Sequence, residues 1–252
     1  MFPMFENTRI VLVSTSHPGN IGATARAMKN MGLRRLYLVN PEDHPSMESY
    51  SRAVGADDVL AEAVVTRSLS EALDGCVWVA GASARDRTIK WPVLSPEQCG
   101  VQNKEYSKQG DVAIVFGREN SGLTNDELEL CNALITIPAN PDYSSLNVSQ
   151  AVQVLCYELR KTMLSDENVV TKKIPKSEND FPASTDELES MYRHFEDTMH
   201  ELGFLEKHNP ENIMRRLKGL FNRAQTTKRE VNILRGILSS SLGRKSAKKS
   251  DR

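Results

Sequence analysis

Five short apolar runs, separated by segments with helical periodicity, constrain the fold of this chain more than any other feature. They are rich in β-branched residues and lie at 10–13, 36–39, 77–80, 112–116 and 134–137. Strands that are apolar on both faces and alternate with helices are typical of a parallel sheet covered by helices on both sides. The length of 252 residues suffices for such a core and for a smaller second domain. We therefore predict an α/β domain.

The sequence changes character after residue 164. The stretch 165–185 mixes polar residues and two prolines without any period, which is typical of a linker. Three amphipathic helical patterns follow, and the tail is then rich in Lys, Arg and Ser without apolar anchors. We predict four segments: an α/β domain at 1–164, a linker at 165–185, a helical domain at 186–242 and a disordered basic tail at 243–252.

The charge is distributed unevenly, although the net charge of the chain is only -1. Between residues 210 and 252, twelve Lys or Arg residues stand against three acidic ones. A basic stretch of this density favours contact with the phosphates of a nucleic acid. A solvated helical bundle remains the alternative explanation for any single residue. The candidates for RNA binding in the predicted helices are Arg215, Arg216, Lys218, Arg223, Lys228, Arg229 and Arg235.

The remaining composition excludes several classes of protein. Four cysteines lie far apart without a Cys-x-x-Cys spacing, which disfavours a disulfide framework or a zinc cluster. The mean hydropathy is -0.43, and no apolar run approaches the roughly 20 residues that a membrane span needs. No secretory signal precedes the first strand. We predict a soluble cytoplasmic protein with reduced cysteines, no metal and no membrane contact.

The first candidate functional motif follows the first predicted strand, over residues 17–26. Asn20 is a good N-cap for the next helix, and Gly32 is expected to end that helix. A strand, a glycine-containing turn and a helix N-terminus together offer amide donors to an anion. Arg26 lies nearly two turns into the helix. Taken alone, the segment fits an ordinary turn with a surface arginine equally well, and it lacks the third glycine of a dinucleotide fingerprint.

The second motif follows the fourth apolar run. Gly117 and Gly122 have the spacing of a phosphate-binding P-loop, with Thr124 in place, but Leu123 replaces its lysine. NTP hydrolysis is therefore disfavoured, and Thr124 instead begins a capping box for the next helix. Glu119 occupies a glycine-flanked loop at the carboxyl edge of the sheet, where it is well placed to meet a ligand. The alternative is a simple polar turn.

The third motif follows the last apolar run, over residues 137–149. A proline-punctuated loop rich in hydroxyls and amides leads into a helix N-terminus whose first amides are free. Ser145 or Asn147 is expected to cap this helix, which ends by about residue 164. The loop suits a small polar ligand as well as it suits capping.

In this order, the three motifs resemble those of the SpoU branch of the SPOUT methyltransferases. The resemblance covers roughly residues 9–164, without a departure at a motif position. The matching residues, motif by motif, are Asn20, Gly22 and Arg26, then Phe116, Gly117, Glu119, Gly122 and Leu123, and last Ser145, Leu146, Asn147 and Ser149. Together with segments 16–20, 81–85 and 140–147 and the basic C-terminal helices, they resemble the bacterial members that methylate cytidine or uridine at nucleotide 32 of tRNA.

The resemblance implies an S-adenosylmethionine-dependent transfer of a methyl group to a ribose 2'-hydroxyl of tRNA. It also implies that the C-terminal part of the α/β fold forms a deep trefoil knot, and that the protein is a homodimer whose subunits both contribute to each site. Two alternatives stay open: an rRNA 2'-O-methyltransferase of the same family, and a non-catalytic RNA-binding member.

Roles for individual residues follow from the same resemblance. Arg26 is expected to be the principal catalytic residue and to contact RNA, while Asn20, Glu119, Ser145 and Asn147 position the ribose and the loops. A guanidinium is hard to deprotonate, so we expect Arg26 to stabilise the emerging alkoxide rather than to take its proton. Cofactor contacts are expected from Ala82, Ser83, Ala84, Gly117, Ile137, Ser144, Ser145 and Leu146.

Overall fold

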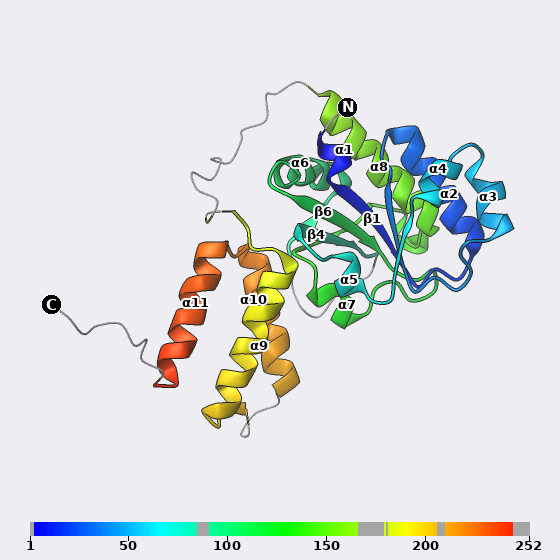
Figure 1. Cartoon of the computed structure of the whole chain (residues 1–252). Coiled ribbons are helices and arrows are strands. Elements are labelled where there is room, and N and C mark those ends of the chain that lie inside the picture. The colour runs from blue at the N-terminus through cyan, green and yellow to red at the C-terminus, as the bar shows by residue number, and fades with distance from the viewer. Residues whose placement is uncertain (1–2, 85–90, 166–178, 180, 206–209, 244–252) are drawn as a thin grey trace.

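The computed structural model of the protein describes residues 3–84, 91–165, 179, 181–205 and 210–243. Its described part contains a seven-stranded, wholly parallel sheet in the order β3-β2-β1-β6-β4-β7-β5 (Figure 1). The strands are β1 (Thr8–Val13), β2 (Arg35–Val39), β3 (Val64–Thr66), β4 (Cys76–Ala82), β5 (Val93–Leu94), β6 (Asp111–Phe116) and β7 (Ala133–Ile135).

Helices alternate with the strands, as predicted. In the α/β part they are α1 (Pro3–Glu6), α2 (Pro18–Met31), α3 (Met47–Ala53), α4 (Asp57–Ala61), α5 (Leu69–Ala72), α6 (Pro96–Tyr106), α7 (Asn125–Glu129) and α8 (Val148–Leu164), with a 3₁₀ helix η1 (Pro141–Tyr143). The C-terminal helices are α9 (Thr185–Glu201), α10 (Pro210–Ala224) and α11 (Lys228–Ser241). Most of the predicted linker and nearly all of the tail lie outside the described residues.

The five apolar runs are confirmed as β1, β2, β4, β6 and β7, with small shifts at their ends. β7 ends at Ile135, so the predicted strand to residue 137 was too long. The two outer strands β3 and β5 were not predicted. Val64, Val65 and Val93 are exposed at these edges, and the strands are only two or three residues long. Short edge strands carry too weak a pattern to be recognised from sequence.

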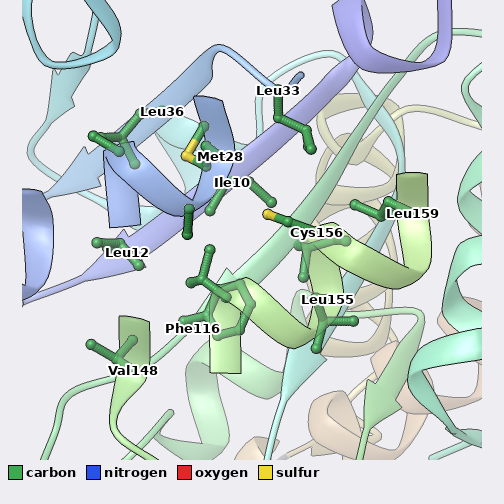
Figure 2. Close-up of a cluster of buried hydrophobic side chains, with 14 of the residues drawn as sticks. Ile10, Leu12, Met28, Leu33, Leu36, Phe116, Val148, Leu155, Cys156 and Leu159 are labelled. Atoms are coloured by element: carbon green, nitrogen blue, oxygen red, sulfur yellow. The ribbon is translucent and has the colours of Figure 1, made fainter. Parts of the chain in front are cut away.

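Both faces of the sheet are buried, which explains why the runs are apolar at every position. Ile10 and Leu12 pack toward α2, α6 and α8, where Met28 and Leu155 complete the larger core (Figure 2). Val11, on the opposite side of β1, packs with residues of α5 and α7. Full burial of a side chain of this size stabilises the fold by about 1.5–3 kcal/mol. The α/β prediction is thus confirmed by its packing.

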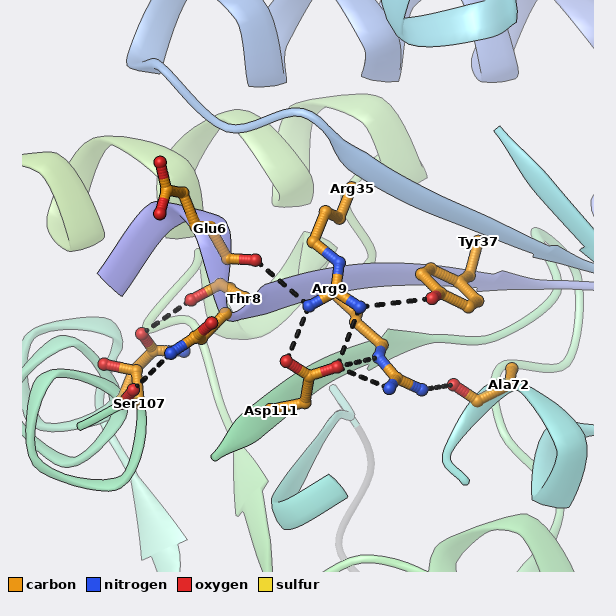
Figure 3. Close-up of polar contacts among 10 residues, drawn as sticks. Glu6, Thr8, Arg9, Arg35, Tyr37, Ala72, Ser107 and Asp111 are labelled. Atoms are coloured by element: carbon orange, nitrogen blue, oxygen red, sulfur yellow. Dashed lines mark hydrogen bonds and ion pairs between the residues drawn. The ribbon is translucent and has the colours of Figure 1, made fainter. Parts of the chain in front are cut away.

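A partly buried ion cluster joins three strands at their amino ends. The Asp111 carboxylate of β6 accepts hydrogen bonds from Arg9 of β1 at 2.5 Å and from Arg35 of β2 at 2.6 and 2.7 Å (Figure 3). Arg9 also donates to the carbonyl oxygen of Ala72 on α5 at 2.9 Å. Burial raises the pKa of Asp111, but the two guanidinium groups outweigh it and hold that pKa below its usual value.

The three C-terminal helices have a core of their own and lie against the α/β part near α7 and β4 (Figure 1). Met191, Tyr192 and Met214 are buried at the centre of this core. Arg215 of α10 pairs with Glu129 at the end of α7, which extends the contact between the two parts. The helical region is therefore packed against the sheet domain through specific polar contacts.

A candidate active site at the carboxyl ends of the strands

The three sequence motifs lie at the carboxyl ends of β1, β6 and β7, as their positions in the chain predicted. The segment 82–84 at the end of β4 completes this edge of the sheet. In open parallel sheets, ligands bind at this edge because the loops that leave the strands diverge there.

The first motif forms the start of α2, but its cap differs from the prediction. The helix begins at Pro18 with His17 as N-cap residue, and Asn20 is the third helical residue. The prediction that Asn20 caps the helix was therefore wrong, since proline at the first helical position moves the start three residues earlier. Gly32 ends the helix in the left-handed conformation, as predicted. The Asn20 side chain therefore does not cap the helix and is available for another contact.

The second motif forms a tight loop stabilised by its own backbone. Arg118 and Gly122 exchange both backbone hydrogen bonds, at 3.2 and 2.9 Å. A Cβ atom on Gly117 would lie 2.1 Å from the carbonyl carbon of Gly122, so only glycine fits at residue 117. The Arg118 guanidinium donates to Glu127 at 3.0 Å and to the Ser14 hydroxyl at 3.3 Å, which ties the loop to the end of β1.

The carboxylate of Glu119 projects from this loop onto the start of α2. It accepts hydrogen bonds from the Asn20 amide at 2.9 Å, from the Ser16 backbone at 3.2 Å and hydroxyl at 3.3 Å, and from the His17 backbone at 3.4 Å. Partial burial favours the neutral acid, but these donors outweigh it and hold the pKa of Glu119 below its usual value. Glu119 is therefore an ionised acceptor that orients the first motif.

The third motif joins the same network through Asn147. Its side-chain oxygen accepts from the Ser149 backbone at 2.9 Å and hydroxyl at 2.7 Å, which caps α8. Its amide group donates to the Asn20 oxygen at 3.0 Å. Asn20 thus accepts from Asn147 and donates to Glu119, so that one chain of hydrogen bonds connects all three motifs. Of the two predicted caps for this helix, Asn147 is confirmed.

A pocket of about 130 Å³ opens between these loops. This is about ten times the space that one water molecule needs. All eight residues expected to contact a cofactor line it, together with Glu119 and Arg118. Those eight are Ala82, Ser83, Ala84, Gly117, Ile137, Ser144, Ser145 and Leu146.

Sequence reasoning missed the contributions of Ser16, His17 and Arg118. Both Ser16 and His17 donate backbone N–H groups to Glu119, which any residue type could do, so no side-chain signal reveals these two bonds. The Ser16 hydroxyl adds a third bond to the same carboxylate. Arg118 could have been singled out, because an arginine beside an acidic ligand-facing residue needs a partner of its own. That partner, Glu127, is the residue that completes the capping box of α7.

Arg26 lies apart from this pocket. Its side chain is exposed on α2, and it is not among the residues that line the pocket. No hydrogen bond or ion pair within the described part of the chain links it to Glu119, Asn20 or Asn147. The structure therefore brings together four of the five expected catalytic residues and leaves the fifth on an outer helix surface.

The basic C-terminal residues divide into two groups. Arg215 pairs with Glu129 and, at 3.4 Å, with Asp126; Lys218 lies 3.5 Å from Glu189. In the same way Lys228 lies 3.6 Å from a carboxylate of α9. The second group, which has exposed side chains, consists of Arg216, Arg223, Arg229 and Arg235. The basic side chains of the C-terminal helices therefore differ in exposure, and Arg215, Lys218 and Lys228 are held in ion pairs within the protein.

Other classes of site find no support in the described residues. Within them, no helix is long and apolar enough to cross a membrane, and no group of three or more potential ligands could hold a metal ion. All four cysteines are free and buried. Burial raises the thiol pKa of Cys76, Cys131 and Cys156 to about 12. The cysteines are packing residues, as the sequence indicated.

Comparison with known families gives two matches along the chain. Residues 7–157 match the SpoU rRNA Methylase family, and residues 186–252 match the C-terminal domain of the tRNA methyltransferase TrmJ. The first match covers the sheet and the three motif loops, and the second covers the C-terminal helices.

Individual relatives agree with these matches. The tRNA (cytidine/uridine-2'-O-)-methyltransferase TrmJ of Yersinia enterocolitica is 48% identical over 237 residues, which is 94% of this chain and 92% of the relative. The enzyme of the same name from Pectobacterium atrosepticum is also 48% identical, over 94% and 97% of the two chains.

Solved structures extend the similarity to three dimensions. The crystal structure of TrmJ from Z. mobilis ZM4 has a TM-score of 0.80 and 34% identity, and the match covers 93% of this chain and 99% of that one. A methylase family protein from Haemophilus influenzae Rd KW20 has a TM-score of 0.62 and 44% identity, over 97% and 100% of the two chains.

Proposed function

The chain belongs to the SpoU methylase family, in the branch that carries the TrmJ C-terminal domain, and we propose that it methylates nucleotide 32 of the tRNA anticodon loop. It is a tRNA (cytidine/uridine-2'-O-)-methyltransferase that uses S-adenosylmethionine. The observation that supports this activity is the hydrogen-bonded chain from Glu119 through Asn20 to Asn147, which fixes the three family motifs beside one pocket. A tRNA-modifying enzyme works where tRNA resides, and we place it in the cytoplasm.

The pocket fits S-adenosylmethionine by the chemistry of its lining. Its walls are apolar at Ile137, Leu146 and Ala82, as the faces of an adenine ring require, and Ser83 and Ser144 offer polar atoms for the edge of the ring. Bound there, the cofactor supplies an activated methyl group on a sulfonium. We propose that the eight residues expected from the sequence hold it, with the loops wrapped in the deep trefoil knot of the family.

The chain itself must position the ribose and stabilise the developing charge on its oxygen. We propose that Asn20, Glu119, Ser145 and Asn147 hold the ribose and the loops in place. Hydrogen bonds link Asn20 to Glu119 and Asn147 and fix the orientation of these three side chains. Ser145 lines the pocket beside them. Arg26 stabilises the alkoxide, since a fixed positive charge lowers the free energy of an emerging anion.

The exposed position of Arg26 supports a homodimer. An arginine that has to reach a ribose oxygen cannot do so from a helix surface outside its own pocket, so we propose that Arg26 enters the site of a second copy. Each site would then combine the pocket and polar chain of one subunit with the guanidinium of the other.

The C-terminal helices supply the surface for the rest of the tRNA. We propose that the helical domain at 186–242 binds RNA phosphates through its exposed arginines, with the α/β domain at 1–164 as the catalytic unit. Arg215, Lys218 and Lys228 make ion pairs within the protein, so their contribution to RNA binding is smaller than the sequence suggested.

Incorporation of labelled methyl groups from S-adenosylmethionine into unmodified tRNA transcripts, followed by nucleoside mapping, tests this proposal. We expect 2'-O-methylcytidine or 2'-O-methyluridine at nucleotide 32. Incorporation at another tRNA nucleotide contradicts the position, and incorporation into rRNA alone establishes the rRNA alternative. RNA binding without any methyl transfer identifies a non-catalytic member of the family.

A further inference from the structure

One aromatic side chain at the rim of the pocket is almost entirely exposed. Tyr143 has 83% of its surface in contact with solvent. The next three residues of the chain, Ser144, Ser145 and Leu146, line the pocket. Tyr143 therefore directly precedes three residues that line the pocket, and its ring is open to solvent.

The backbone that carries Tyr143 is held in place although the side chain is free. Pro141 opens the 3₁₀ turn η1, and the side-chain oxygen of Asn140 accepts from the Asp142 backbone at 3.1 Å. The Tyr143 backbone donates to the Asn140 carbonyl oxygen at 2.9 Å. A tyrosine on a fixed turn loses little conformational entropy when it binds, because only two side-chain torsions remain to be ordered.

We propose that Tyr143 determines how the target base is held, by stacking its ring against the face of that base while the ribose enters the pocket. This inference rests on the proposed function. Methylation of a ribose hydroxyl in an RNA loop requires the nucleotide to leave its stack, and unstacked bases are commonly received by aromatic side chains.

Stacking also accounts for the acceptance of two different bases. Cytosine carries an amino donor where uracil carries a carbonyl acceptor, so a side chain that reads this edge by hydrogen bonding accepts one and rejects the other. A ring that stacks on the flat face of the base binds cytosine and uracil alike, because the two bases differ at the edge. Tyr143 is thus suited to an enzyme that methylates both cytidine and uridine.

The charge beside Tyr143 favours a base over a phosphate. Asp142, its neighbour on the turn, is exposed, and its carboxylate repels a phosphate group. The ring is therefore suited to contact the uncharged base of a nucleotide rather than its phosphate.

The test uses the full-length protein and a tRNA anticodon stem-loop that carries the fluorescent cytidine analogue pyrrolocytidine at the methylated nucleotide. Stacking quenches this fluorophore, and S-adenosylhomocysteine keeps the complex from reacting. We expect quenching by wild type and Tyr143→Phe, and loss of quenching in Tyr143→Leu. With ordinary tRNA, kcat/KM should fall about tenfold or more in Tyr143→Leu and stay within about twofold in Tyr143→Phe.

Matched measurements separate stacking from other effects. Tyr50 is an exposed tyrosine on α3, and Tyr50→Leu should behave as wild type in both assays. The S-adenosylmethionine affinity of Tyr143→Leu should be unchanged. A lower cofactor affinity overturns the inference, because it makes Tyr143 part of the cofactor pocket, and an equal loss in Tyr143→Phe overturns it in favour of a hydrogen bond from the hydroxyl.

The inference and the proposed function fail in different ways. If wild type transfers no methyl group to tRNA, the proposed function is wrong, while the quenching assay still reports whether Tyr143 stacks on a bound base. If methyl transfer is normal and Tyr143→Leu retains both kcat/KM and quenching, the role of Tyr143 is wrong and the proposed function stands.

Discussion

Single residues at the candidate site obtain their properties from partners about a hundred positions away in the sequence. Glu119 is held ionised by donors from the start of α2, and Asn20 is oriented by Glu119 and Asn147 together. An amide whose oxygen accepts and whose nitrogen donates has one preferred orientation. Arg26 and Asp111 illustrate two other situations: Arg26 is an exposed charge outside the pocket, and Asp111 is a partly buried charge paired with two arginines.

Removal of the Arg26 guanidinium should abolish most turnover and leave cofactor binding intact. The expected loss in kcat for Arg26→Ala is about 100-fold or more, the size found when one donor to a developing oxyanion is deleted. Single-turnover methylation and calorimetric titration with S-adenosylmethionine measure the two effects. Arg67→Ala removes another exposed arginine and serves as control. Retained turnover in Arg26→Ala would exclude a catalytic role.

The Asp111 ion cluster should make the free energy of unfolding depend on pH in the acidic range. Because the pKa of Asp111 is held below 3.8 in the folded state, its contribution is complete above about pH 3.8 and disappears as the pH falls through the folded value. Asp111→Asn leaves two cationic partners without their carboxylate, so the free energy of unfolding at pH 7 should fall by about 3 kcal/mol. Urea unfolding from pH 7 to pH 3 should show the difference from wild type shrinking in acid; a constant difference contradicts the assignment.

Whole elements at the site serve two purposes, since the groups that begin a helix also orient the loops. Asn147 caps α8 with its oxygen and bonds to Asn20 with its nitrogen. Arg215 of α10 is basic in sequence but connects this helix to α7, whereas Arg216 beside it is exposed. The contribution of a residue therefore depends on which side of its element it occupies.

Two substitutions at Asn147 should separate helix capping from site geometry. Asn147→Asp keeps the oxygen that caps α8 but cannot donate to Asn20, so stability should stay within about 0.5 kcal/mol while turnover falls strongly. Asn147→Ala should lose turnover and about 1 kcal/mol of stability as well. Thermal unfolding and methyl transfer distinguish them. Full activity of Asn147→Asp would show that the bond to Asn20 is dispensable.

Neighbouring arginines on α10 should behave differently. Arg216→Ala should weaken tRNA binding and reduce the slope of log K against log salt by roughly 1, as expected for one lost phosphate contact, without a change in stability. Arg215→Ala should lower stability, because it leaves Glu129, whose side chain is only 11% exposed, without its cation. Salt-dependent binding and unfolding of both variants check this; equal salt slopes would contradict the division of the basic surface.

At the scale of the whole molecule, the expected catalytic arginine is exposed on α2 and does not line the pocket of its own chain. We propose that a second copy presents its Arg26 to the pocket, so that the proposed homodimer is needed for catalysis rather than for stability. A C₂ pair offers two equivalent sites of this kind.

Mixed dimers should reveal shared sites. Arg26→Ala and Glu119→Ala are each expected to be inactive alone. A dimer of one Arg26→Ala and one Glu119→Ala subunit contains one site with both groups intact if the arginine comes from the partner, and none if it comes from the same subunit. We expect methyl transfer to reappear when the two variants are unfolded together and refolded. Continued inactivity, with mixed dimers demonstrated by differential tags, would place Arg26 in its own subunit's site.

The sequence by itself determined the features that depend on near neighbours. Local periodicity and capping predict the five strands β1, β2, β4, β6 and β7, the caps at Thr124 and Asn147, the end of α2 at Gly32 and the three C-terminal helices. Those patterns are satisfied within a few residues. The family motifs belong to the same class, since each is contiguous in the chain.

Only the tertiary structure decided which distant groups meet. The sequence made Asn20 a helix cap, whereas the fold makes it the link between Glu119 and Asn147. It counted Arg215 with the RNA-binding residues, whereas the fold pairs it with Glu129. In both cases the local pattern allows several hydrogen-bond partners, and the partner is selected by packing of segments about 90 to 130 residues apart, which no local pattern encodes.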